Sequence, residues 1–150
     1  MQVSTSHDVE MPADALFDAV ADFDLLERMM VRRGAQVTRL EPPAGSPMSW
    51  DIAFDWRGRR REMRLHVTSY DRPEKVQMHG TSDSFDVEIR ADIVALSRYR
   101  SRLVLTIEGK ARTIKARLML QTAKLTRGSI DKKFEARVAA YLDGLAARDA

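Results

Sequence analysis

Alternating apolar and polar residues between residues 50 and 67 constrain the fold of this chain most strongly. The apolar members fall at every second position on each side of Arg57-Gly58: Trp50, Ile52, Phe54 and Trp56 before it, and Met63, Leu65 and Val67 after it. A two-residue turn at Arg57-Gly58 would place facing residues in consistent pairs. Among the polar residues that alternate with them, this turn would place Asp51 opposite Arg64 and Asp55 opposite Arg60, two pairs of opposite charge. The sequence therefore predicts a β-hairpin with one buried face.

Patterns elsewhere extend this hairpin to a larger sheet. Residues 3–9 alternate as a first strand, and two short amphipathic helical stretches follow before a short strand at 36–41. Further strands are predicted from the alternation of Val76, Met78 and Gly80, then over 85–95 and 103–107. Helical spacing returns from about residue 114, with apolar stripes that fall out of phase across 127–129, so we expect a kink or short break there. Residues 1–150 are predicted to form a single domain.

The second helical stretch has recognisable end signals. Asp24 followed three residues later by Glu27 predicts a capping box at its start. Gly34 predicts its end, since glycine adopts the conformation that commonly terminates a helix. Leu25, Leu26, Met29 and Met30 would form its buried side.

Composition excludes several classes of protein. The chain has no cysteine, which rules out disulfides and thiolate metal sites, and its three histidines lack metal-ligand spacing. A net charge of only +3 does not indicate a dedicated nucleic-acid binder. The first residues lack a signal-peptide pattern, and no apolar run approaches the length of a membrane span. We expect a cytoplasmic protein with no metal and no cofactor.

The stretch Met11–Asp24 carries a family resemblance. Its spacing of Pro12, Leu16, Phe17, Val20 and Asp22 is similar to that of the START/SRPBCC superfamily, within which the polyketide cyclase/dehydrase and coenzyme Q-binding type resembles it most. The resemblance implies an α+β helix-grip fold: a seven-stranded curved antiparallel sheet wrapped around a long C-terminal helix, with two short helices between the first two strands. It also implies a ligand cavity between the sheet and the last helix.

The predicted function is binding or transport of a small hydrophobic or amphipathic ligand, such as a lipid, an isoprenoid or quinone, or a polyketide-like molecule. The apolar residues expected to line the cavity are Trp50, Phe54, Trp56, Met63, Leu65, Met78, Phe85, Val87, Ile89, Leu105 and Ile107, with Leu118, Phe134 and Val138 closing it. Two polar residues are expected to orient the ligand. Arg61 would pair with a carboxylate or phosphate, and His7 lies on the inward parity of the first strand. The alternative for the run from Arg57 to Arg64 is a solvated hairpin tip.

Two other functions are also compatible with the sequence. A cyclase or dehydratase would use the same cavity, with His7 as its acid or base, although no partner for His7 stands out. A co-chaperone-like interaction module would instead bind through an exposed apolar patch on the sheet. The cations around the start of the C-terminal helical region are Lys110, Arg112, Lys115, Arg117, Lys124 and Arg127. They indicate a solvated face or, alternatively, transient contact with an anionic membrane. A monomer and a homodimer are both compatible with the sequence.

Overall fold

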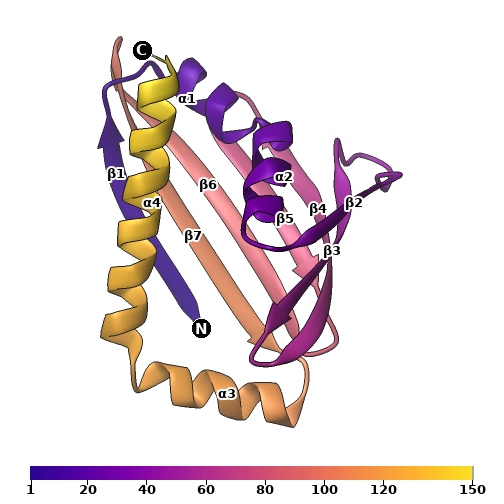
Figure 1. The fold of residues 1–150 in the computed structure, drawn as a ribbon. Helices are drawn as coiled ribbons and strands as arrows, with labels where there is room; N and C mark the ends of the chain where they lie inside the picture. The colour runs from indigo at the N-terminus through magenta and orange to yellow at the C-terminus, as the bar shows by residue number, and fades with distance from the viewer. Residues whose placement is uncertain (150) are drawn as a thin grey trace.

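The computed structural model describes residues 1–149 and contains one seven-stranded antiparallel sheet. Its strands run in the spatial order β1-β7-β6-β5-β4-β3-β2. The strands are β1 (Gln2–Val9), β2 (Gln36–Leu40), β3 (Ser49–Trp56), β4 (Arg59–Asp71), β5 (Lys75–Thr81), β6 (Phe85–Ser97) and β7 (Arg100–Ala111). The helices are α1 (Ala13–Val20), α2 (Phe23–Arg32), α3 (Ile114–Lys124) and α4 (Arg127–Asp149). This is the predicted α+β arrangement, with α1, α2 and α4 on one face of the sheet and α3 across its end (Figure 1).

The hairpin of β3 and β4 has the predicted register. Arg57 and Gly58 both adopt positive φ, 52° and 72°, as a two-residue turn between twisted strands requires. Trp50 pairs with Leu65 and Asp51 with Arg64, whose side chains form an ion pair of 3.0 Å. Asp55 also lies opposite Arg60, but the Arg60 guanidinium bonds the Gln36 side chain instead. One of the two predicted charge pairs is therefore formed.

The start of α2 differs from the prediction. Asp22 is the capping residue, and its side chain accepts a hydrogen bond from the Leu25 backbone N–H at 3.1 Å. Asp24 and Glu27, predicted to form the capping box, both bond Arg39 on β2. The helix begins two residues earlier than predicted, because Asp22 also has a side chain that can cap a helix. Gly34 follows the end of α2 with φ of +93°, as predicted.

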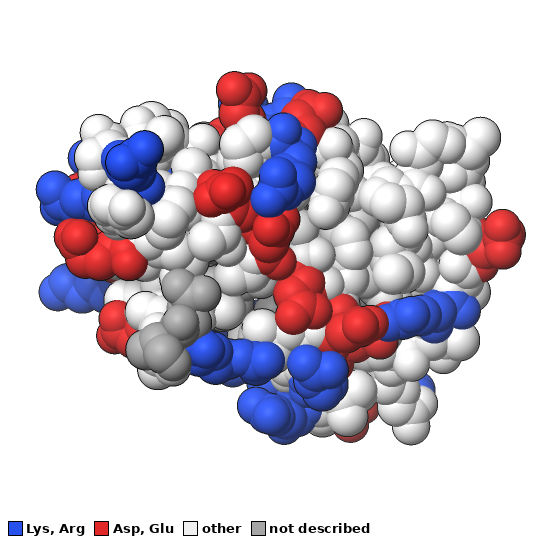
Figure 2. Space-filling view, turned by 90° about the horizontal axis from the view of Figure 1, so that it is seen from above, with Lys and Arg blue, Asp and Glu red and all other residues white. Residues whose placement is uncertain are grey.

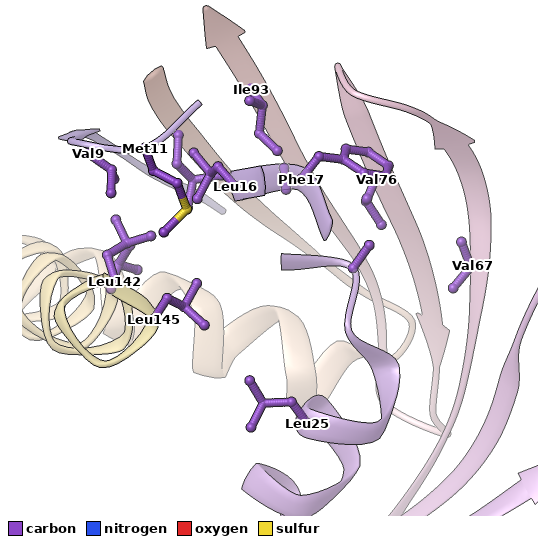
Figure 3. Close-up of a cluster of buried hydrophobic side chains, with 14 of the residues drawn as sticks. Val9, Met11, Leu16, Phe17, Leu25, Val67, Val76, Ile93, Leu142 and Leu145 are labelled. Carbon is purple, nitrogen blue, oxygen red and sulfur yellow. The ribbon is translucent and has the colours of Figure 1, made fainter. Parts of the chain in front are cut away.

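The hydrophobic core lies at one end of the sheet. There α1, α2 and the C-terminal part of α4 cover the inner face, and their side chains meet those of the strands (Figure 3). Phe17 and Leu16 are fully buried, and Leu142 and Leu145 approach them from α4. Phe17 also makes an edge-to-face contact with Tyr70 at 5.1 Å.

The C-terminal region is two helices. α3 ends at Lys124 and α4 begins at Arg127, close to the break predicted at 127–129. α3 crosses the end of the sheet opposite α1, and α4 turns to run along the side of β1 (Figure 1). Only α4 therefore provides the long helix of the predicted fold, and α3 forms a separate element at the other end.

Candidate functional site

The inner face of the sheet changes from packed to open along its strands. On β3, Trp50 is fully buried, Ile52 is 7% exposed, Phe54 is half-buried and Trp56 is 40% exposed. β7 follows the same trend, from Leu103 at 1% to the half-buried Leu105 and Ile107. The helices α1 and α2 cover only the first end, so apolar side chains at the second end lack a full covering layer. This open end is the candidate site.

A cavity of about 450 Å³ lies at this open end, between the β3–β4 hairpin and the β5–β6 turn. Its volume is within the range of small-molecule sites. The lining combines apolar inner-face residues with polar residues of the two turns: Phe54, Trp56, Met63, Phe85 and Val87, with Arg59, Arg60, Arg61, Glu62, Ser82, Asp83 and Ser84. A ligand with an apolar body and a polar group would match this division.

Arg61 is the cavity residue with the least satisfied polar group. Its Nε is buried and has no hydrogen-bond partner in the described part of the chain, and none of the ion pairs there involves it. Its guanidinium carbon lies 5.2 Å from the centroid of the Trp56 ring, and Arg57 contacts the same ring at 4.8 Å. The aromatic face stabilises the cation only partly. A buried donor without an acceptor is costly, so this position favours an anionic ligand group.

Around Arg61 the hairpin has the register that the two-residue turn predicts, but Arg61 does not contact the ring directly opposite it. Arg61 lies opposite Phe54 and Arg59 lies opposite Trp56. The ring that Arg61 contacts, however, is Trp56, its diagonal neighbour across the strands. Long side chains reach diagonal neighbours readily, which pairing alone does not specify.

Gly80 on β5 leaves room for the side chain of Met63, which lines the cavity. A Cβ atom at Gly80 would lie 2.7 Å from the Met63 sulfur, closer than real atoms approach. Met63 therefore lies directly over the Gly80 backbone. Sequence reasoning placed Gly80 in a strand but missed this role, although a glycine inside a strand often marks a close approach.

The β5–β6 turn at the cavity mouth was not predicted as part of the site. Arg112, just before α3, holds this turn with two bonds: its backbone N–H donates to Ser84 O at 2.8 Å, and its Nη1 donates to Ser82 O at 2.6 Å. The mouth of the cavity is thus tied to the start of α3.

Trp50 belongs to the core and does not line the cavity. It is fully buried, contacts Phe23 edge-to-face at 5.7 Å and donates its indole N–H to Glu27 at 2.7 Å. Arg39, which also bonds Glu27, holds the pKa of that carboxyl below its usual value of 4.5, and the Trp50 N–H acts in the same direction. Leu65, only 5% exposed, likewise belongs to the packed end.

The other predicted lining residues divide between the two ends. Met78, Ile89, Leu105 and Ile107 are half-buried on the inner face, deeper along the sheet than the cavity mouth. Phe134 is half-buried and Val138 is 5% exposed, both on α4 against the core. Leu118 is 58% exposed and lies on the opposite side of α3 from the buried Ala116. Its expected role in closing the cavity therefore does not fit its position, because the break before α4 reorients α3.

His7 lies far from Arg61. It is half-buried on β1, where its Nε2 and the Thr5 hydroxyl are 3.0 Å apart, and it lines a separate hollow against α4 with Ala139 and Leu142. Four strand spacings separate β1 from β4, or about 19 Å. The structure thus does not bring the two predicted polar residues to one site.

The outer face of the sheet is polar. His66 and His79 lie there, and His79 bonds the Glu88 carboxylate and the Thr81 hydroxyl. A hollow of about 580 Å³ on this side is lined by charged residues that include the Asp51–Arg64 pair. Among the described residues, no group of three or more histidine, aspartate or glutamate side chains is arranged to hold a metal ion. Nor does any described helix combine the length and apolar character needed to cross a membrane.

No family model and no curated protein matches the sequence of this chain. Solved structures do match it. An aromatase/cyclase from Streptomyces sp. aligns with a TM-score of 0.69 and 20% identity, covering 100% of this chain and 96% of the other. A START superfamily protein from Mycobacterium smegmatis aligns at 0.57 and 16%, covering 88% and 95%. Norcoclaurine synthase from Thalictrum flavum, in complex with a transition state analogue, aligns at 0.69 and 10%, covering 100% and 96%. This likeness shows that the chain has the helix-grip fold.

Proposed function

We propose that this helix-grip protein binds a small amphipathic ligand that has an apolar body and an anionic group. The apolar body occupies the cavity beside Phe54, Phe85 and Val87 and extends toward the half-buried residues deeper on the inner face. The anionic group, a carboxylate or a phosphate, pairs with Arg61. The observation that carries this proposal is the buried Arg61 Nε, which has no partner in the described chain and lies at the cavity.

Apolar burial supplies the driving force in this proposal, and Arg61 supplies orientation. Each CH₂ group removed from water contributes about 0.8 kcal/mol. A charge-assisted hydrogen bond to a carboxylate contributes about 1.5–3 kcal/mol more. Ligands with an alkyl or aromatic body and one acidic group therefore gain from both parts of the lining.

Binding of dodecanoate, followed by the fluorescence of Trp56 and Trp50, tests the proposal. We expect saturable 1:1 binding, with the change in emission arising from the exposed Trp56 and not from the buried Trp50. Native mass spectrometry of freshly purified protein gives a second readout, in which a co-purified acidic amphiphile would support the proposal. Absence of saturable binding for acidic ligands of alkyl and aromatic type would refute it.

The two other functions have weaker support. The enzyme alternative relied on His7, which lies four strands from Arg61 and faces a different hollow. The interaction-module alternative would be favoured by an exposed apolar patch on the sheet, but ion pairs such as Arg90–Asp92 and Arg102–Asp8 lie on the outer face near the exposed Val94 and Leu96. Ligand binding without turnover is therefore the function that we propose.

A further inference from the structure

α3 exposes an apolar ridge. Ile114 is 77% exposed, Leu118 is 58% exposed and Leu125, which directly follows the helix, is 86% exposed. At 3.6 residues per turn these three side chains fall within an arc of about 40°. Ala116, 1% exposed, lies on the other side and packs toward the sheet. The ridge thus puts large apolar side chains on the side of α3 that faces away from the protein, where a surface helix usually has polar residues.

Cations flank this ridge, and acidic residues are missing from it. Between Glu108 and Asp131 the sequence has no aspartate or glutamate and six lysine or arginine residues. Two of the six, Lys110 and Arg127, have acidic neighbours at 3.9 and 3.7 Å. Lys115, Arg117 and Lys124 take part in none of the ion pairs found among the described residues, and they lie to either side of the ridge. At the opposite end of the molecule, acidic and basic side chains are intermixed (Figure 2).

We propose that α3 is a docking surface for an anionic lipid bilayer. The three ridge side chains would enter the boundary between headgroups and acyl chains, while Lys115, Arg117 and Lys124 contact lipid phosphates. An apolar ridge between cations, on a segment that has no acidic residue between Glu108 and Asp131, is the charge complement of such a surface. The absence of a membrane-spanning helix among the described residues is compatible with docking in the interface plane.

A second copy of this chain fits the ridge less well. The three side chains of the ridge offer much less than the roughly 800 Å² that each partner contributes to a stable dimer. A symmetric contact through the same face would also bring the flanking cations of both copies together. An anionic bilayer removes both problems because it buries the ridge and neutralises the cations.

Docking through α3 would place the cavity mouth near the lipid. Arg112 joins the start of α3 to the β5–β6 turn, which lines the cavity. An amphipathic ligand could then pass between bilayer and cavity, a consequence that rests on the proposed function. The docking itself does not depend on it, because vesicle binding is measured on the ligand-free chain.

Vesicle flotation with the full chain tests this proposal. We expect binding to phosphatidylcholine vesicles that contain phosphatidylglycerol, little binding to phosphatidylcholine alone, and a marked loss in high salt. Ile114→Ser/Leu118→Ser should weaken binding at least about tenfold. Lys115→Gln/Lys124→Gln should weaken it roughly 25-fold, at about fivefold per cation.

Matched changes elsewhere provide the controls. Val94→Ser/Leu96→Ser alters exposed apolar residues at the β6–β7 hairpin, and Arg33→Gln/Arg98→Gln removes two exposed cations. Both control proteins should bind vesicles as the original chain does. The proposal would be overturned if the chain bound neutral vesicles as well as anionic ones, or if the control variants lost as much binding as the α3 variants. A concentration-dependent dimer in sedimentation that Leu118→Glu dissociates would overturn it too, in favour of a second copy.

Discussion

The guanidinium carbon of Arg61 lies 5.2 Å from the centroid of the Trp56 ring, at the mouth of a cavity on the open end of the sheet. This contact holds the arginine in place without satisfying its buried Nε. Arg61 is therefore held in position but has no acidic partner among the described residues, an arrangement that favours binding of an anion. The ligand proposal and the first prediction follow from this relationship.

Arg61→Gln should lower the affinity for dodecanoate by about 10- to 100-fold, because one charge-assisted bond is lost. It should change the affinity for dodecanol, which has the same alkyl chain without a charge, by much less. Fluorescence titration of both ligands measures the difference. Arg64→Gln is the matched control, since Arg64 pairs with Asp51 on the outer face. Equal losses for acid and alcohol would show that Arg61 does not contact the anionic group.

Gly80→Ala should destabilise the protein by about 1–3 kcal/mol, because the new Cβ overlaps the Met63 sulfur. Met63→Ala in the same chain should recover most of this loss, so the two changes should be strongly non-additive. Urea unfolding of the single and double variants measures the coupling. Gly109→Ala, where an added Cβ meets no atom within 4 Å, is the control. Additive effects would place Met63 away from Gly80.

Glu27→Ala should destabilise the protein by about 1–3 kcal/mol, since it leaves the buried Trp50 N–H without an acceptor. Asp24→Asn, which changes another partner of Arg39 at an exposed position, should have a smaller effect. The Glu27 contribution should also depend on pH. Because its folded-state pKa lies below 4.5, its stabilisation is present above that pH and is lost as the pH falls further. Urea unfolding at neutral and acidic pH tests both statements. If the difference in free energy of unfolding between the original chain and Glu27→Gln did not change with pH, the second statement would be contradicted.

Tyr141 should make the fold sensitive to high pH. Burial raises its pKa to about 12, and the Asp22 carboxylate acts in the same direction. A raised folded-state pKa means that stability is complete below the unfolded value of 10.0 and falls as the pH rises toward 12. The loss should reach about 2 kcal/mol and be missing in Tyr141→Phe. Tyr99→Phe, at a residue 68% exposed, should retain it. Denaturation across this pH range makes the comparison, and identical pH profiles for all three proteins would contradict it.

Features set by residues close together in the sequence were predictable, whereas features set by tertiary contacts were not. The register of β3 and β4 was predictable because a two-residue turn fixes every pair that follows it. The inward parity of Phe54 and Met63 followed from the same alternation. The choice between Asp22 and Asp24 as helix cap was not predictable from spacing, since both residues have the required side chain.

The division into a packed and an open end depends on tertiary structure. Trp50 and Trp56 have the same parity, and alternation treats them alike. Only the placement of α2 over Trp50 makes one a core residue and leaves the other at the cavity. The direction of Leu118 likewise depends on the angle at the break between α3 and α4, which a helical period does not determine.

Magnetisation transfer between a bound ligand and the protein tests the central claim most directly. In an NMR experiment with dodecanoate, we expect contacts from the alkyl chain to the ring protons of Trp56 and Phe85 and to the Met63 methyl group. Contacts confined to the hollow beside His7 and Leu142, or to the α3 ridge, would contradict the account.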